Sequence, residues 1–223
     1  ENYKSTTRDV SILLDSLNEI GMDALVIDLR YNGGGSLDEA IDLTGLFIPS
    51  GPVVQVRNTD NSIDILSDDN PKVMYEGPLA VLENRYSASA SEIFAAAIQD
   101  YKRGIVFGEN SFGKGTVQSL LSLERPVLNY LNRLIAVNQF SNNDDLIDLR
   151  DKVKNQEISL GQLKMTLAKF YRASGSSTQR TGVRPDIAFP SYFTSDEVGE
   201  SSSPSALPWD EIGSSKFSST YDV

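Results

Sequence analysis

The first half of the chain alternates between segments of helical and of strand-like hydrophobic pattern. Residues 8–20 carry an apolar stripe at helical spacing, so we expect a helix there. Ser36 and Glu39 form a capping-box pattern ahead of a second amphipathic segment. An Ala-rich helix is expected to follow the serine-rich stretch at 87–92 and to run to about Tyr101.

Short apolar runs lie between these helical segments and predict strands. They cover residues 24–29, 53–56, 79–82 and 104–108. Continuous apolar runs of this length are typical of strands covered on both faces. Strands that alternate with helices predict an α/β fold with a mostly buried sheet flanked by helices. The residues around 60–70 are interpreted as an acidic loop.

The second half is less regular. Residues 142–156 are polar and charged, which predicts a solvated helix or an inserted loop. Residues 163–172 fit both a strand and a helix period, so the pattern alone leaves both open. From Ser191 onward, six acidic residues against Lys216 give a net charge of −5. We expect residues 191–223 to be a polar acidic segment that is extended or loosely attached.

Composition removes several chemistries. The 223 residues include no histidine and no cysteine, which excludes a Ser-His-Asp triad, a thiol nucleophile, a Cys/His zinc site and disulfides within this chain. The net charge of −11 disfavours binding to nucleic acid and to anionic lipid. No apolar run reaches the roughly 18 residues of a membrane span. An acid/base step near neutral pH must use a carboxylate, a lysine, a tyrosine or a bound ion.

Two glycine- and serine-rich junctions follow predicted strands. At Asn32-Gly33-Gly34-Gly35, backbone N–H groups can point outward toward a phosphate or a developing oxyanion, although a tight turn alone also explains the glycines. At 87–92, Ser89 and Glu92 form a capping box. Ser89 is therefore either a helix cap or a sterically open hydroxyl beside a helix N-terminus that favours negative charge.

A third junction, Gly108–Thr116, nearly matches a phosphate-binding loop. Gly115 stands where that loop needs a Ser or Thr to bind magnesium, and the helix that should follow is missing from the pattern. A P-loop-like nucleotide binder is thus the alternative. Without histidine, a serine can instead be activated by the neutral amine of Lys114. Burial would have to lower the lysine pKa to roughly 7–8, and Gln118 could orient the amine.

Together these segments resemble the tail-specific, or C-terminal processing, serine peptidases of bacteria. The resemblance runs from about residue 10 to 190 and is carried by four blocks in order, at residues 26–35, 84–94, 112–118 and 170–187. Ala206–Asp210 also fits the periplasmic tail-specific branch. The resemblance implies a crotonase or Clp-peptidase-like α/β core, in which residues 163–172 form a strand, and neither a cofactor nor a metal.

The resemblance also assigns roles. It implies that Ser89 is the nucleophile, that Lys114 is the general base and that Gln118 orients the lysine. Glu92 and Asp100 are expected to have supporting roles. Eleven residues of helix separate Ser89 from Asp100, or about 16 Å, so contact between them is not expected.

The oxyanion donors are expected to be the amide of Ala90 and that of Gly34 or Gly35. The expected substrates are proteins or peptides with apolar C-termini. The expected location is the periplasm, with a peripheral position at the membrane left open. Family members carry a PDZ domain that captures substrate tails, and nothing in this chain corresponds to it. We therefore interpret residues 1–190 as a peptidase core cut from a longer chain, and a non-catalytic peptide-binding module on the same fold as a further alternative.

Overall fold

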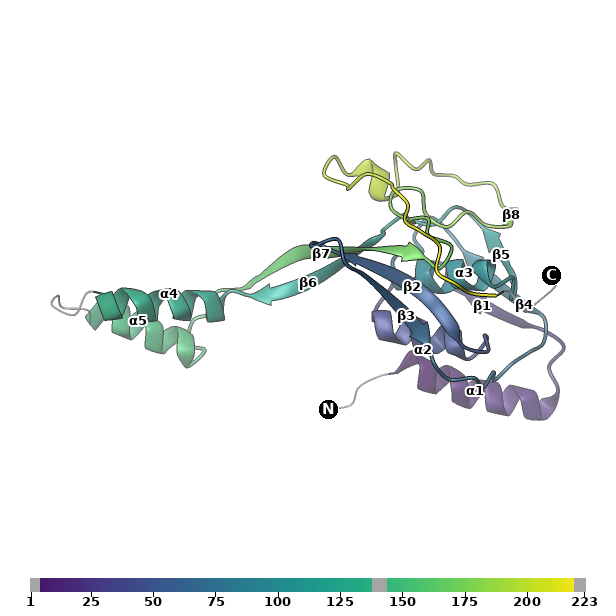
Figure 1. The fold of residues 1–223 in the computed structure, drawn as a ribbon, viewed down its shortest axis with the longest axis horizontal. Helices are drawn as coiled ribbons and strands as arrows, with labels where there is room; N and C mark the ends of the chain where they lie inside the picture. Colours follow the sequence, from purple (N-terminus) through teal and green to yellow (C-terminus); the bar gives the residue numbers. More distant parts are fainter. Residues whose placement is uncertain (1–4, 138–143, 219–223) are drawn as a thin grey trace. The chain divides into compact units, whose positions relative to one another are not determined.

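The computed structural model describes residues 5–137 and 144–218, which form two compact units (Figure 1). The core unit comprises residues 1–116 and 168–223, and the inserted unit comprises residues 117–167. Residues 142, 143 and 219–223, for which the sequence made predictions, lie outside the described residues. Within the described residues, no helix has both the length and the apolar character needed to cross a membrane.

The core unit contains a parallel sheet whose strands match three of the predicted apolar runs. The sheet order is β1 (Leu25–Asp28), β4 (Leu79–Glu83), β5 (Ile105–Gly108) and β8 (Ile187–Ala188). All neighbouring pairs are parallel. The carboxyl ends of parallel strands meet at one edge of a sheet. Because the three glycine- and serine-rich junctions follow β1, β4 and β5, this topology brings all three to the same edge.

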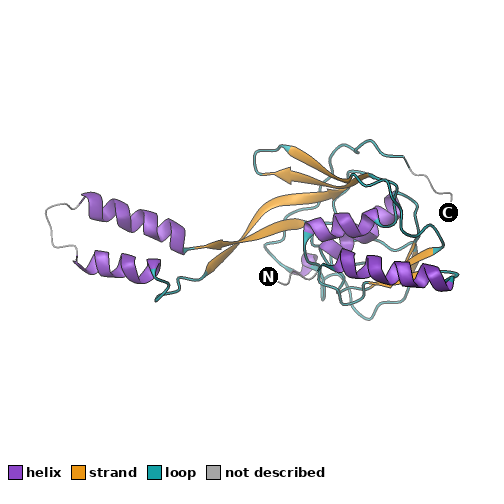
Figure 2. Ribbon diagram, turned by 90° about the horizontal axis from the view of Figure 1, so that it is seen from below, coloured by secondary structure: helices purple, strands orange, loops and turns teal. Residues whose placement is uncertain are grey.

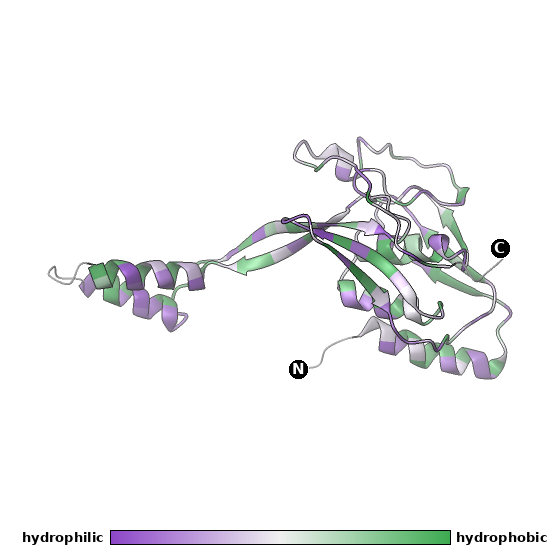
Figure 3. Ribbon diagram, viewed as in Figure 1, coloured by the Kyte–Doolittle hydropathy of each residue, from purple (hydrophilic) through white to green (hydrophobic). Residues whose placement is uncertain are grey.

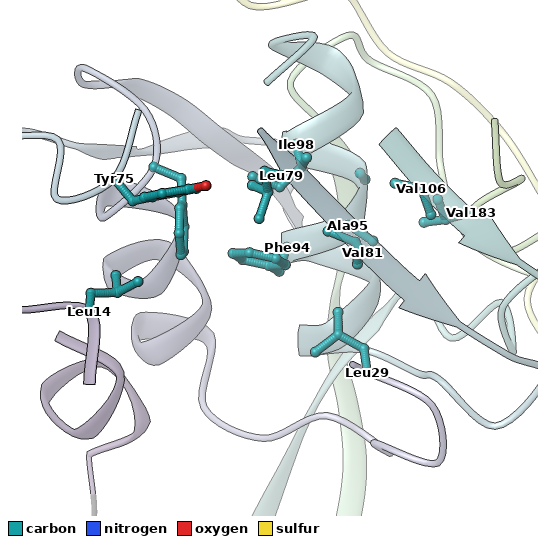
Figure 4. Packing of buried hydrophobic residues seen from close by; sticks show 12 residues of the cluster. Leu14, Leu29, Tyr75, Leu79, Val81, Phe94, Ala95, Ile98, Val106 and Val183 are labelled. Atoms are coloured by element: carbon teal, nitrogen blue, oxygen red, sulfur yellow. The ribbon is translucent and has the colours of Figure 1, made fainter. Parts of the chain in front are cut away.

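Among its described residues, the core unit has three α-helices, α1 (Thr6–Ile20), α2 (Leu37–Gly45) and α3 (Ala90–Asp100), and one 3-10 helix, η1 (Glu200–Ser202). The predicted N-terminal cap of α2 is confirmed, because the backbone amide of Glu39 donates to Ser36 Oγ (3.4 Å). Apolar residues of α3 pack against the parallel sheet in one cluster (Figure 4). Its buried members include Phe94, Ile98, Val81 and Val106. This packing fixes the N-terminus of α3, and thus the serine-rich junction, over the sheet edge.

A second sheet has the order β3 (Ile63–Asp68), β2 (Gly51–Asn58), β7 (Gln162–Arg172) and β6 (Thr116–Ser122). The strand that the resemblance implied for residues 163–172 is confirmed as β7. The interpretation of residues 60–70 as an acidic loop is wrong, because β3 lies within them and pairs antiparallel with β2. The strand was missed because it lies at a sheet edge with half of its residues exposed and one buried, so polar residues are tolerated in it.

The inserted unit carries two helices, α4 (Glu124–Val137) and α5 (Asp144–Lys154), which pack on each other (Figure 2). The described part of the polar stretch 142–156 is therefore mainly helical. Each helix buries one residue, Leu131 in α4 and Val153 in α5. Figure 3 shows hydrophilic residues interleaved with hydrophobic ones along both helices. α4 was not predicted, although its apolar residues have helical spacing (Val127, Leu128, Leu131, Leu134 and Ile135).

The described part of the C-terminal segment, residues 191–218, is bonded to the rest of the core unit. The expectation of a loose attachment is therefore wrong for this part. Trp209 Nε1 donates to the carbonyl of Ser177 (2.8 Å). Asp210 accepts from Arg57 (2.5 Å), Tyr171 (3.1 Å) and Lys169. The acidic composition was interpreted as solvated charge, whereas Asp210 serves as the partner of two partly buried cations.

We predict that D210N weakens this attachment at neutral pH. Partial burial raises the pKa of Asp210, but hydrogen bonds from Lys169 and Arg57 lower it by more, so it lies below its ordinary value of 3.8. A lowered pKa means that the stabilisation is present above about pH 4 and is lost as the pH falls through the folded-state value. Because Asp210 is one-third exposed, we expect a loss of only about 1–2 kcal/mol.

Urea unfolding at a series of pH values measures this difference. D196N is the matched control, because Asp196 lies in the same segment and makes no hydrogen bond or ion pair with any described residue. The difference between D210N and wild type should shrink below about pH 4. Equal stability of D210N and D196N at pH 7 would contradict the prediction.

Candidate active site

The three junctions at the sheet edge are joined to each other by hydrogen bonds. The carbonyl of Asn32, in the first junction, accepts from the amide of Ala88 (3.0 Å) and from Ser91 Oγ (2.9 Å) in the second. The amide of Phe112, in the third junction, donates to the carbonyl of Ser87 (2.9 Å). The turn that could hold an oxyanion and the loop that carries the lysine are thus both attached to the serine-rich junction.

The three serines of that junction differ in environment. Ser87 is fully buried, and its hydroxyl donates to the carbonyl of Leu29 (2.8 Å). Ser91 is buried and bonded to Asn32. Ser89 is partly exposed and has φ 60° and ψ −115°, a strained conformation for a residue with a side chain. A serine presented on a strained turn between a strand and a helix is the geometry of a nucleophile elbow.

The glycine turn packs directly on Ser89. Gly34 has φ +98°, and a Cβ at this position would lie 2.7 Å from the carbonyl oxygen of Ala88 and 2.8 Å from Ser89 Cβ. Only glycine therefore allows the turn to approach so closely. The amide of Gly34 already donates to Asn32 Oδ1 (3.0 Å).

Within residues 5–137 and 144–218, the amides of Gly35 and Ala90 donate to no acceptor. Ala90 directly follows Ser89 as the first residue of α3, where N–H groups lack partners in the helix. Gly35 directly follows Gly34, which packs on Ser89. Of the two glycines that the sequence proposed as oxyanion donors, Gly35 has the amide available for that role.

Glu92 connects the turn that carries Ser89 to the loop that carries Lys114. Its side chain is fully buried and accepts four hydrogen bonds. One carboxylate oxygen accepts from the amides of Ser89 (2.7 Å) and Lys114 (3.0 Å). The other accepts from the amide of Gly113 (2.7 Å) and from Ser111 Oγ (2.6 Å). Burial raises the pKa of Glu92 to about 7, while these hydrogen bonds lower it.

The lysine loop, residues 112–115, is held through its backbone while its lysine side chain is only partly buried. Gly113 has φ +91°, and the loop continues into strand β6. The helix that a phosphate-binding loop requires is therefore replaced by a strand, which counts against the nucleotide-binding alternative. No hydrogen bond joins Lys114 Nζ to Ser89 Oγ among the described residues. A catalytic contact of this kind is often longer without substrate.

Two further residues singled out by the sequence lie elsewhere. Asp100 is the last residue of α3, and its nearly buried carboxylate pairs with Arg172 (2.6 Å) and accepts from the amide of Ser174 (3.2 Å). It thereby anchors the far end of the helix, as expected. Gln118 belongs to the inserted unit, where its amide donates to Thr166 Oγ1 (3.4 Å). Its role toward Lys114 stays a prediction.

Sequence reasoning missed an apolar cavity beside the glycine turn. The cavity has a volume of about 340 Å³, and Gly34, Gly35 and Ala90 contribute to its wall. Its apolar lining consists of Leu29, Ala40, Leu43 and Phe94. Leu29 directly follows β1, Ala40 and Leu43 belong to α2, and Phe94 belongs to α3. In the sequence they are ordinary members of an apolar run and of helical stripes. Only the fold reveals that they face one space next to Ser89.

Comparison with known proteins agrees with this geometry. Residues 1–189 match the model of peptidase family S41. The chain is 46% identical to the tail-specific protease of Haemophilus influenzae, over 96% of this chain and 27% of that protein. It is 35% identical to the carboxy-terminal-processing protease of Bartonella bacilliformis, over 73% of this chain and 30% of that protein. The chain thus spans less than a third of the length of these relatives.

Solved structures show the same fold. The photosystem II D1 C-terminal processing protease superposes with a TM-score of 0.63 at 26% identity, over 84% of this chain and 40% of that chain. Mature CPAF in complex with lactacystin superposes with a TM-score of 0.59 at 14% identity, over 89% of this chain and 45% of that chain. At 14% identity, the second likeness concerns the fold alone.

We predict that E92Q is strongly destabilising. An amide in place of the carboxylate would set an NH₂ group against two of the four donors, which would then lose their acceptor in the buried site. Leaving two buried donors unsatisfied costs about 2–6 kcal/mol. Urea unfolding measures the loss. Because the pKa of Glu92 is raised to about 7, wild type loses stability as the pH rises from about 4.5 to about 7, so the loss in E92Q should be larger at pH 5 than at pH 8.

Glu83 provides the matched control. It is as buried as Glu92, but neither of its carboxyl oxygens has a hydrogen-bond partner among the described residues, and burial raises its pKa to about 9 from 4.5. A raised pKa means that wild type loses stability relative to E83Q as the pH rises from about 5 to about 9. E83Q should therefore equal or exceed wild type in stability at pH 8. A loss in E83Q as large as that in E92Q would contradict the account.

Proposed function

The chain belongs to peptidase family S41, and we propose that it is the catalytic part of a serine endopeptidase that degrades or processes proteins from near apolar C-terminal tails. Residues 1–190 carry the peptidase core in this proposal. The single observation that supports it most is the buried Glu92 carboxylate, which binds the amides of both Ser89 and Lys114. If Glu92 only capped α3, it would not also need to bind the backbone of the loop that carries Lys114.

In the first half of the reaction, Ser89 Oγ attacks the scissile carbonyl carbon while the neutral amine of Lys114 takes the hydroxyl proton. The resulting oxyanion accepts hydrogen bonds from the amides of Ala90 and Gly35. These donors have no other acceptor among the described residues, and α3 directs its N-terminus toward the developing charge. The C–N bond then breaks, and the Lys114 ammonium returns a proton to the leaving amine.

In the second half, a water molecule hydrolyses the acyl-enzyme. Lys114 takes a proton from the attacking water, and a second tetrahedral oxyanion forms in the same turn. When it collapses, the bond between Ser89 Oγ and the acyl carbon breaks. The proton held by Lys114 returns to Ser89 Oγ, and the new carboxyl terminus leaves. One lysine thus acts as base and then as acid in each half-reaction.

The apolar cavity supports a preference for an apolar residue on the acyl side of the scissile bond. It lies beside the turn that would hold the oxyanion, and its volume of about 340 Å³ suits one large apolar side chain. The Haemophilus relative is named a tail-specific protease, and the Bartonella relative is named a carboxy-terminal-processing protease. We extend that substrate class to this chain on the strength of the cavity.

We further propose that the chain acts within a longer periplasmic protein, at the periphery of the membrane, whose PDZ domain captures the substrate C-terminus. The family resemblance supports the PDZ domain, and the chain spans only 27% of the Haemophilus relative. The relative's bacterial origin and tail-specific name support the compartment. Fractionation and a pull-down with apolar-tailed peptides test these two points.

We predict that S89A and K114A each abolish cleavage of a reporter protein with an apolar C-terminal tail. Loss of either member of such a unit should lower kcat by at least about 10³-fold. The measurement uses the full-length protein, with K72A as control because Lys72 is exposed and its amine makes no contact with a described residue. Chelators should have no effect.

Three outcomes separate the alternatives. Retained cleavage in S89A or K114A would contradict the dyad. Tail binding without cleavage in wild type, unchanged in S89A, would favour the non-catalytic peptide-binding module. Heat released on titration with Mg-ATP would favour the nucleotide binder.

Substitution of Leu43 tests the cavity. L43F narrows it and should lower kcat/KM for peptides with Leu or Phe before the scissile bond more than for peptides with Ala there. L43A widens it and should shift the preference in the opposite direction. One methylene group in such a pocket is worth roughly 10- to 200-fold in discrimination. Equal changes for all peptides in both variants would show that the cavity does not receive the substrate.

A further inference from the structure

A fully buried glutamine contacts the lysine loop from the C-terminal half of the core unit. Gln179 Oε1 accepts from the amide of Gly115 (2.8 Å). Its Nε2 donates to the carbonyl of Leu207 (3.2 Å) and to Glu200 Oε1 (3.2 Å). A backbone amide can only donate and a backbone carbonyl can only accept, so these partners determine the orientation of the side-chain amide.

Backbone contacts surround this glutamine. The amide of Arg180 donates to the carbonyl of Gly113 (2.7 Å), and that of Glu200 donates to the carbonyl of Phe112 (2.9 Å). A Cβ at Gly115 would lie 2.7 Å from the backbone nitrogen of Gln179. The lysine loop therefore packs directly on the chain around Gln179, and the C-terminal segment contacts both.

We propose that Gln179, with Glu200 and Leu207 (the brace), is a positioning element for Lys114. Glu92 holds the amides of Gly113 and Lys114, and Gln179 holds the next amide along. The lysine Cα is thereby held on both sides, which limits rotation of the loop. The C-terminal segment, through Glu200 and Leu207, then contributes to catalysis. This inference rests on the proposed function of Lys114.

A displaced base affects proton transfer more than substrate binding. The brace contacts the loop behind the lysine and does not line the apolar cavity. Misplacement of a catalytic group by about 1 Å can cost roughly 100-fold in rate. Loss of the brace should therefore lower kcat and leave KM nearly unchanged. General unfolding would instead lower the fraction of active protein, and a second substitution that restores the contact would not reverse that loss.

The central experiment is a charge-conserving swap in the full-length protein. Q179E keeps the acceptor for Gly115 but sets a carboxylate against the Leu207 carbonyl and the Glu200 carboxylate. We expect kcat on an apolar-tailed reporter to fall roughly 10- to 100-fold, with KM within about twofold of wild type. In Q179E/E200Q, an amide at position 200 can again donate across the contact, and most of the lost kcat should return.

Q99E is the matched control. Gln99 also donates its side-chain amide to a backbone carbonyl and a carboxylate, those of Arg184 (2.9 Å) and Asp186 (3.1 Å), and makes no hydrogen bond to the lysine loop among the described residues. Its kcat should stay near that of wild type. An equal loss in Q99E and Q179E, a loss in Q179E that appears only in KM, or no recovery in the swap would overturn the inference.

Amide hydrogen exchange gives a readout that does not depend on peptidase activity. The Gly115 amide should exchange faster in Q179A than in wild type, and faster also in E200A, a milder change at a partly exposed residue. Unchanged exchange in both variants would overturn the brace. If K114A retained activity, the proposed dyad would fall and the catalytic role of the brace with it, while accelerated Gly115 exchange would still show that the contact exists.

Discussion

The site depends on one buried carboxylate that serves two chain segments at once. Glu92 caps the turn that carries Ser89 and also binds two successive amides of the lysine loop. Burying a carboxylate is costly, and here four donors offset part of the cost. Ser89 and Lys114 therefore do not take up independent positions, because any movement of one segment away from the other leaves donors without an acceptor. In the proposed dyad, this shared partner takes the place of the direct connection that a histidine would make in a triad.

The parallel sheet makes that arrangement possible. Strands β1, β4 and β5 are neighbours in space, so the segments that follow them emerge side by side although more than 20 residues separate each strand from the next along the chain. Small residues then allow close approach, since Gly34 packs on Ser89 without room for a Cβ. The chemistry is thus assembled from backbone amides and two side chains, on a frame set by the packing of α3 against the sheet.

Sequence patterns captured the elements with strong periodicity and the local caps. Ser36, the apolar runs of β1, β4 and β5, and the start of α3 followed from residues close together in the chain. The capping role of Glu92 was visible as well. Its second role was not, because Gly113 and Lys114 lie 21 and 22 residues away and only strand pairing brings them near. The same reason hid the apolar cavity, the partners of Asp210 and the contact of Gln179 with Gly115.

The most direct test of the account is to identify the residue that carries the acyl group. The full-length protein is mixed with an ester of an apolar acyl group and quenched in acid within the first turnover, and the labelled peptide is mapped by mass spectrometry. The proposed mechanism predicts that wild type carries one acyl group, on Ser89, and that K114A carries none. An acyl group on Ser87 or Ser91, or ester hydrolysis without any acylated serine, would contradict it.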